Sequence, residues 1–121
     1  MFEVEGVVVG GARLGRKLGF PTANIAIASD LAVENGVYSS MVYVEGVAYP
    51  AMTNVGVRPS VDGKQRLLEA HLFGFEGDLY GLTLRVELRE KIRDEKKFSS
   101  VEELKEQIAK DRETVESKFK K

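Results

Sequence analysis

The sequence predicts a mainly β fold, a sheet or barrel followed by one C-terminal α-helix. From Phe2 to about Glu90, short apolar stretches rich in valine, tyrosine and leucine alternate with breaks that contain glycine, and no helical period appears. After Phe98 the apolar residues change to helical spacing. The 121 residues, 43% of them hydrophobic, suit one compact domain. We therefore expect a single domain, with the sheet up to about residue 92, a loop over 93–98 and a helix over about 99–119.

Turn signals divide the first part of the chain into six predicted strands. Glu45-Gly46 is typical of a tight hairpin turn, so the strands on either side should be antiparallel neighbours. Glu76-Gly77-Asp78 predicts a second such turn. Every second residue from Leu82 to Leu88 is apolar, so the last strand should have one buried and one solvated face. The predicted strands are Phe2–Val9, Thr22–Ile27, Gly36–Val44, Val47–Asn54, Leu67–Phe73 and Leu79–Glu90.

The C-terminal segment carries the signals of an amphipathic helix. Ser100 with Glu103 fits a capping box, and Ser99 with Glu102 is an equally good register. A helix cannot bury an apolar stripe alone, so we expect it to dock on the sheet and close one mouth of a barrel, with partner binding as the alternative. The predicted stripe is Val101, Leu104, Ile108, Val115 and Phe119.

Composition excludes several classes of function. The 18 lysines and arginines balance 19 acidic residues, so the net charge of -1 gives no overall attraction for nucleic acid or anionic lipid. The chain has no cysteine, which excludes disulfides, thiolate metal sites and cysteine nucleophiles. No apolar run has the length of a membrane span, and the start lacks the regions of a signal peptide. We expect a cytoplasmic protein without a nucleic-acid or membrane partner.

A basic, glycine-rich segment joins the first two predicted strands. Gly10 to Pro21 holds four glycines together with Arg13, Arg16 and Lys17, a mixture that suits a cradle for phosphate. It is neither a Walker A loop nor a GxGxxG fingerprint. On composition alone, a flexible basic loop is the favoured interpretation.

The string LGFPTANI, residues 18–25, changes this interpretation because it resembles the signature of riboflavin kinases, including the kinase half of bacterial bifunctional FAD synthetases. The resemblance implies a closed six-stranded antiparallel β-barrel of Greek-key type, with a C-terminal α-helix packed on it. It also implies transfer of the γ-phosphate of MgATP to the 5′-hydroxyl of riboflavin, giving FMN and ADP. Further matching blocks follow in the family's order: Gly36–Tyr38, Asn54–Pro59, Leu68–Leu72, Asp78–Gly81, Ile92–Phe98 and the start of the final helix.

The sequence departs from the usual bacterial pattern at a few points. Ser60 stands where threonine is common, and Gly74 where aspartate often occurs; neither belongs to the implied catalytic set. The nucleotidyltransferase half of the bifunctional members has no counterpart in this sequence, so we expect no FAD synthesis by this chain. The kinase either stands alone or belongs with an FMN adenylyltransferase domain.

The resemblance implies that Thr22 and Asn24 bind the Mg²⁺ of MgATP through a hydroxyl and an amide oxygen. Residues two apart on a strand point to the same side, as a shared ion requires. Mg²⁺ takes oxygen ligands and is often shared with substrate phosphates, so two neutral protein oxygens can suffice. Without the resemblance, Thr22 and Asn24 would be interpreted as the end of a turn after Pro21.

Glu69 corresponds to the glutamate that acts as catalytic base in this family. In that role it would accept the proton of the riboflavin 5′-hydroxyl as this oxygen attacks the γ-phosphorus in line. Alternation alone would place Glu69 and His71 on one solvated strand face. His71, the only histidine, is interpreted as an orienting or structural residue.

Two further groups of residues match ligand positions of the family. Arg93, Lys96 and Phe98 match the flavin side, where an aromatic ring and cations suit the isoalloxazine and the new phosphate. A charged loop with Phe98 as a hydrophobic staple is the alternative. The ATP-binding positions are Gly10, Arg16, Leu72 and Tyr80, together with Thr22 and Asn24.

Three other functions are alternatives to kinase activity. A small barrel could bind an oligonucleotide, or a flavin or nucleotide without catalysis, since a fold does not determine function. The balanced charge and the lack of an aromatic and basic strand surface argue against nucleic acid. A flavin binder would not need Thr22, Asn24 and Glu69 together. An interaction domain that uses the charged helix would leave the other blocks unexplained.

Overall fold

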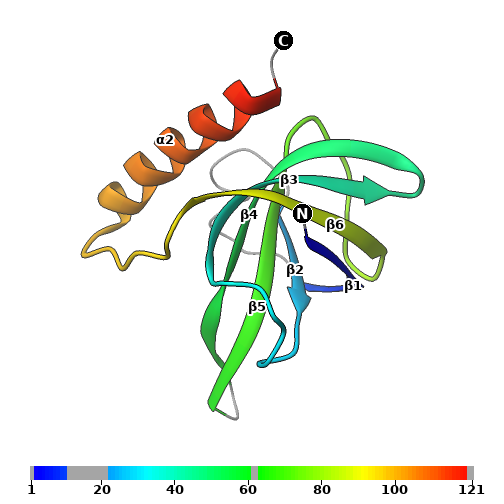
Figure 1. The fold of residues 1–121 in the computed structure, drawn as a ribbon, viewed down its shortest axis with the longest axis horizontal. Helices are drawn as coiled ribbons and strands as arrows, with labels where there is room; N and C mark the ends of the chain where they lie inside the picture. The colour runs from blue at the N-terminus through cyan, green and yellow to red at the C-terminus, as the bar shows by residue number, and fades with distance from the viewer. Residues whose placement is uncertain (1, 11–21, 61–62, 120–121) are drawn as a thin grey trace.

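The structure, a computed structural model, describes residues 2–10, 22–60 and 63–119. Six antiparallel strands form a closed barrel in the order β1-β2-β5-β4-β3-β6, with one helix packed on it (Figure 1). The predicted mainly β class and barrel architecture are confirmed. The elements are β1 (Phe2–Gly10), β2 (Thr22–Ala26), β3 (Gly36–Val44), β4 (Val47–Ser60), β5 (Gly63–Leu72), β6 (Thr83–Arg93) and α2 (Val101–Phe119).

Alternation along the strands separates the barrel interior from its outer face. Leu68, Ala70 and Leu72 of β5 are fully buried in the interior core. Successive side chains of a strand point to opposite faces, so Glu69 and His71 lie on the outer face. The same parity places Asn54 outside on β4, between the buried residues Thr53 and Val55. The interior is a packed core, and the polar residues of interest lie outside it.

One of the two predicted hairpin turns is confirmed. Val44 pairs with Val47 across Glu45 and Gly46, whose φ angles of 48° and 84° are those of a type I′ turn. The turn predicted at 76–78 does not form a hairpin. Strand β5 pairs with β2 and β4, and β6 pairs with β1 and β3, so the segment between them joins strands that are not neighbours.

Strands β4 and β5 extend beyond their predicted ends. The ladder between them continues from Asn54↔Glu69 to Ser60↔Gly63, although the sequence predicted that β4 ends at Asn54 and β5 begins at Leu67. Gly56 and Pro59 are unusual in strands, but Pro59 lies close to the hairpin end, where a missing donor is tolerated. Strand β6 begins and ends later than predicted, at Thr83 and Arg93 instead of Leu79 and Glu90. Leu79 is buried in a turn before it, and Arg93 is its last residue.

The helix begins with the predicted capping arrangement in the Ser100 register. The Glu103 N–H donates to the Ser100 hydroxyl over 3.2 Å. The Glu103 carboxylate accepts from the N–H and hydroxyl of Ser99 at 3.1 and 2.8 Å. The backbone donors at the start of α2 are thereby satisfied locally, which stabilises its first turn.

Helix α2 covers the outside of the barrel rather than its mouth. Val115 is fully buried against Val37 of β3 and Met52 of β4, with Ile108 and Phe119 partly buried beside them. The expectation of a closed mouth is wrong because side chains from all six strands fill the interior, while the outer face of β3 and β4 is apolar here and needs a cover. Val101, predicted in the stripe, is 54% exposed.

An ion pair anchors α2 to the end of β6. Asp111 is 3% exposed and accepts from Arg93 Nε at 3.0 and 3.1 Å and from Nη2 at 2.7 Å. Gln107 donates to the same carboxylate at 3.0 Å. A bidentate contact of this kind restricts both distance and orientation. Together with the apolar contacts, it sets the position of α2 and of the segment 94–100 that leads into it.

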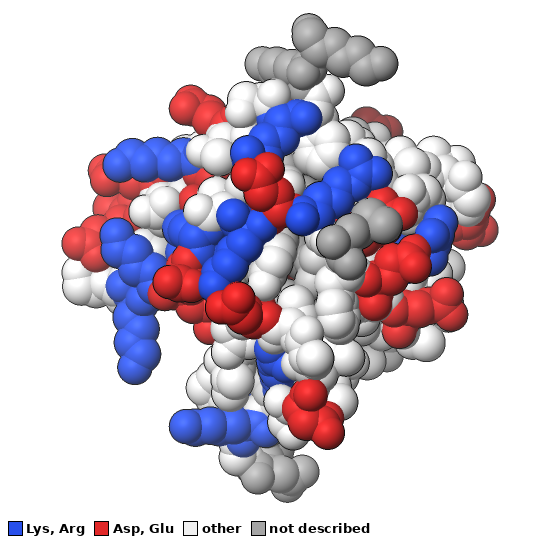
Figure 2. All heavy atoms as spheres, in the orientation of Figure 1, with Lys and Arg blue, Asp and Glu red and all other residues white. Residues whose placement is uncertain are grey.

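Charges of both signs are interspersed on the face shown in Figure 2, in agreement with the near-zero net charge. Among the described residues, no helix is both long and apolar enough to span a membrane.

We predict that Asp111→Ala lowers the free energy of unfolding by about 2 kcal/mol, because it leaves a largely buried arginine without its partner; the exposed part of Arg93 keeps this below the full value for a buried pair. Urea unfolding followed by circular dichroism measures the change. Glu113→Ala, on the exposed face of the same helix, is the control and should change stability by less than about 0.5 kcal/mol. Equal effects of the two substitutions would contradict the anchoring role.

Candidate active site

Three polar side chains form a row across the outer face of β2, β5 and β4. Asn24 stands opposite Glu69, and Glu69 stands opposite Asn54. Glu69 Oε1 is buried and lies 2.7 Å from Arg58 Nη2, whereas Asn24 Oδ1 and Asn54 Oδ1 are buried without a hydrogen-bond partner among the described residues. A buried acceptor without a donor is costly, so such oxygens mark a place where a ligand, ion or water is bound.

Thr22 and His71 form the next rung of the same ladder. They are register partners, and Thr22 Oγ1 lies 3.0 Å from His71 Nδ1. Burial lowers the pKa of His71 to about 4, so its ring is neutral near pH 7. In the tautomer with its proton on Nε2, Nδ1 accepts the Thr22 hydroxyl proton and leaves the hydroxyl oxygen free to bind a cation.

The residues present fit a magnesium ion. Thr22 and Asn24 are two apart on β2 and present a hydroxyl and an amide oxygen on the same side. The amide oxygen of Asn24 is buried and has no donor among the residues that the structure describes, which suits a metal ligand. Neutral oxygens are suitable ligands for Mg²⁺ when phosphates supply the negative charge.

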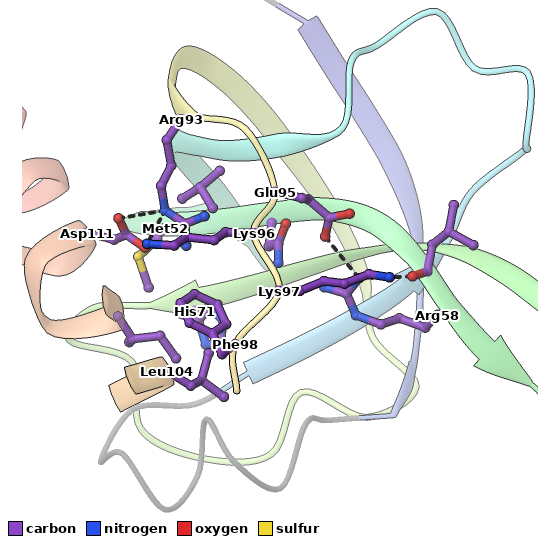
Figure 3. A pocket seen from close by; sticks show the side chains of 14 residues that line it. Met52, Arg58, His71, Arg93, Glu95, Lys96, Lys97, Phe98, Leu104 and Asp111 are labelled. Carbon is purple, nitrogen blue, oxygen red and sulfur yellow. Dashed lines mark hydrogen bonds and ion pairs between the residues drawn. The ribbon is translucent and has the colours of Figure 1, made fainter. Parts of the chain in front are cut away.

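A pocket of about 420 Å³ lies beside this row, between the outer face of the barrel, the segment 94–100 and α2 (Figure 3). Its walls are apolar on the barrel and helix sides and charged at the edges. Figure 3 shows Arg93 with Asp111 at one end, Arg58 with Glu95 at the other, and Phe98 and His71 between. The lining residues are Val37, Met52, Asn54, Val57, Arg58, His71, Arg93, Glu95, Lys96, Lys97, Phe98, Leu104, Ile108 and Asp111.

The three predicted flavin residues all line this pocket, in different ways. Phe98 presents its ring, with Lys96 Nζ 5.8 Å and Arg93 Cζ 6.0 Å from the ring centroid. These distances are within the range of cation–π contacts. The guanidinium of Arg93 is largely occupied, since it also donates to the Asp94 carbonyl oxygen at 2.9 Å in addition to Asp111.

The predicted ATP-binding residues do not all come together. Gly10 ends β1 directly opposite Asn24, next to the predicted metal ligands. Tyr80 is 69% exposed in the turn before β6. Leu72 is fully buried in the barrel interior. Arg16 lies outside the described residues, as do Arg13 and Lys17.

Sequence reasoning assigned no role to Asn54, Arg58 and Glu95, which the structure brings to the site. Arg58 Nη2 lies 2.7 Å from Glu69 Oε1, and its Nη1 lies 2.9 Å from Glu95 Oε1. A strand period of two through Asn54 and Arg58 would have placed both on one face, but the predicted strand ended at Asn54. Nothing local marks Glu95, because its contacts are made across the barrel surface.

A model of the flavokinase family, described as riboflavin kinase, matches residues 1–119. The chain is 44% identical over 119 residues to the bifunctional riboflavin kinase/FMN adenylyltransferase of Escherichia coli K12, covering 98% of this chain and 38% of that protein. It is 41% identical over 120 residues to an RNA-binding riboflavin kinase of Bacillus subtilis, covering 98% of this chain and 52% of the relative. The barrel therefore has the fold of a known family of kinases. The chain is a member of the flavokinase, or riboflavin kinase, family.

Two solved structures share the fold, and one of them is a riboflavin kinase. A riboflavin kinase from Trypanosoma brucei superposes with a TM-score of 0.66 at 25% identity, covering 97% of this chain and 78% of that one. A Streptococcus pneumoniae protein titled as a macrolide-efflux protein superposes with a TM-score of 0.80 at 36% identity, covering 94% of this chain and 38% of that one. The chain spans about two-fifths of the length of the Escherichia coli relative described above. Since one relative is named as RNA-binding, the absence of a nucleic-acid partner stays a prediction.

We predict that stability falls by about 2 kcal/mol between pH 7 and pH 5 through His71. Its folded pKa of about 4 lies below the unfolded value of 6.5, so the unfolded chain binds more protons in this window and stability is lost as the pH falls. Urea unfolding at several pH values measures this slope. His71 is the only histidine, so His71→Gln should remove most of the slope; an unchanged slope in this variant would contradict the assignment.

Proposed function

We propose that this chain is an ATP:riboflavin 5′-phosphotransferase that converts riboflavin and MgATP into FMN and ADP. The observation that carries the proposal is the position of Glu69. Asn24 is its register partner on one side, and on the other side Asn54 lines the pocket that holds Phe98 and Lys96. A base between a metal-binding strand and an aromatic pocket has the phosphoryl donor on one side and the acceptor on the other.

In the proposed reaction, Glu69 accepts the proton of the riboflavin 5′-hydroxyl. The hydroxyl oxygen forms a bond to the γ-phosphorus of ATP while the bond from that phosphorus to the β,γ-bridging oxygen breaks, and ADP leaves with the electron pair. The transfer is direct, without a phosphoenzyme. Glu69 has a side chain only 14% exposed, which limits competition from water for the carboxylate.

Thr22 and Asn24 are the proposed ligands of the magnesium ion that accompanies ATP. When bound, Mg²⁺ neutralises charge on the phosphoryl oxygens. Thr22 is oriented for this role by the contact of its hydroxyl with His71. Gly10 lies beside Asn24 without a side chain, which suits close approach of phosphate to the backbone.

Riboflavin is proposed to bind in the 420 Å³ pocket, whose volume is within the usual range of about 300–1,000 Å³ for small-molecule sites. The apolar wall formed by Met52, Leu104 and Ile108 suits one face of the isoalloxazine, and Phe98 suits ring packing. Lys96 is placed to meet a carbonyl or the new phosphate, and Arg93 chiefly holds the wall in place through Asp111.

We also propose that residues 1–121 form one kinase domain that works in the cytoplasm; the family match spans residues 1–119. An FMN adenylyltransferase domain, present in the bifunctional relatives, is the proposed partner where the two activities occur together.

Glu69→Gln is expected to reduce kcat by about 10²- to 10⁴-fold, the range for loss of a general base. Chromatographic separation of riboflavin and FMN measures turnover. Glu5→Gln, an exposed glutamate on β1, is the control and should have wild-type activity. Turnover of Glu69→Gln within about tenfold of the wild type would remove Glu69 from the base role. If the wild type forms no FMN with ATP, GTP or CTP, the kinase proposal is wrong.

Thr22→Ala and Asn24→Ala are each expected to raise the Mg²⁺ concentration needed for half-maximal activity by about tenfold or more, since each removes one protein ligand. Mg²⁺-dependent binding of ADP, followed by calorimetry, gives a readout that does not depend on turnover. An unchanged Mg²⁺ dependence in both variants would count against the metal assignment.

A further inference from the structure

Arg58 connects the proposed base to the loop that covers the pocket. It lies on the outer face of β4, four residues beyond Asn54, and its side chain reaches back along the strand to Glu69. Its other terminal nitrogen donates to Glu95, in the segment between β6 and α2. The separations are 2.7 Å to Glu69 Oε1 and 2.9 Å to Glu95 Oε1. One guanidinium therefore joins two carboxylates that are 26 residues apart in the sequence. Figure 3 shows its contact with Glu95.

The two contacts differ in quality. Arg58 and Glu95 make a hydrogen bond as well as an ion pair, whereas Glu69 Oε1 is paired with Arg58 without an aligned hydrogen bond. Burial disfavours the charged guanidinium, but the charge of Glu69 and then the hydrogen bond to Glu95 outweigh this and raise the pKa of Arg58. Arg58 is therefore a permanent positive charge that contacts both carboxylates, through a hydrogen bond to Glu95 and an ion pair with Glu69.

Gly56 makes this arrangement possible. It lies between Asn54 and Arg58 on the same strand face, and a Cβ at this position would lie 2.0 Å from Glu95 Oε1. The Glu95 carboxylate thus occupies the space that a side chain at position 56 would fill. Because Gly56 has no side chain, the Glu95 carboxylate has room to lie beside Arg58.

We propose that Arg58 is a positioning residue for Glu69 and that Glu95 in turn positions Arg58: Glu95 holds the guanidinium through a hydrogen bond, and the guanidinium fixes the Oε1 atom of the base so that Oε2 is directed to the hydroxyl proton. This inference rests on the proposed kinase function and adds residues to its site. Without Glu95, the guanidinium would lose the hydrogen bond that holds it beside Glu69, and the base would lose its fixed orientation. Without Arg58, two nearby carboxylates would repel each other and lose their common partner.

The arrangement also connects the orientation of Glu69 to the proposed flavin pocket. Glu95 is three residues before Phe98, and both line the pocket that is proposed to hold riboflavin. A shift of the segment 94–98 on flavin binding would move Glu95, and with it the Arg58 guanidinium that contacts Glu69.

The first experiment compares kcat and KM in Arg58→Gln and Arg58→Lys. We expect Arg58→Gln to lower kcat by about 10- to 100-fold through misorientation of the base, with KM for ATP within about twofold. Arg58→Lys keeps the charge and should recover a substantial part of kcat. The control is Arg85→Gln, which breaks an exposed ion pair with Glu3 outside the site. A kcat for Arg58→Gln within about twofold of the wild type, or equal losses in kcat and in the affinity for ATP, would overturn the positioning role.

The second experiment tests whether Glu95 acts through Arg58. Glu95→Gln removes the charge, and Gly56→Ala displaces the carboxylate while keeping the charge; each is expected to lower kcat by roughly three- to tenfold, less than loss of the base itself. In the Arg58→Gln background, Glu95→Gln should have no further effect, because its partner is already gone. An equal effect of Glu95→Gln with and without Arg58 would overturn the link.

Failure of this inference and failure of the proposed function give different results. If the wild type forms FMN and the Arg58 variants behave like it, the kinase function stands and the inference is wrong. If the wild type forms no FMN, the kinase proposal fails, and amide hydrogen exchange decides the link. Faster exchange over residues 94–98 in Arg58→Gln than in Arg85→Gln supports it, and equal exchange in these two variants overturns it.

Discussion

The register between β2, β5 and β4 is the constraint on which the rest of the site depends. It places Glu69 opposite Asn24 on one side and Asn54 on the other, on the outer face of the barrel. A shift by one residue in a strand would exchange its inner and outer faces, turning Glu69 into the core and Leu68 out of it. Burial of Leu68, Ala70 and Leu72 therefore maintains the position of the proposed base, because the same alternation produces both.

The pocket depends on a second constraint, the docking of α2 on the barrel. Val115 packs on the outer face of β3 and β4, and the ion pair of Asp111 with Arg93 ties the helix to the end of β6. These contacts hold both ends of the segment 94–100, which forms a wall of the pocket and carries Phe98 and Glu95. Contacts that stabilise the fold thus also shape the proposed flavin site.

Much of this could be predicted from the sequence. Apolar alternation and turn residues predicted six strands, and helical spacing predicted α2, because these patterns are local. The capping pair Ser100 and Glu103 was predictable for the same reason. The extension of β4 was missed because Gly56 and Pro59 usually interrupt strands, and only the ladder with β5 shows why they are accommodated. The segment 76–78 has turn residues, but they cannot reveal that β5 and β6 are not neighbours.

By itself, the sequence determined the class of fold, the resemblance to riboflavin kinases, and the residues Thr22, Asn24 and Glu69 as candidates, since motif and periodicity are properties of short stretches of chain. The tertiary structure alone decided that Asn24 and Glu69 are register partners and that Arg58 joins Glu69 to Glu95. The physical reason is that these contacts connect strands and a loop distant in sequence. Barrel closure and helix docking determine which of these residues come into contact, and both depend on the packing of the whole chain.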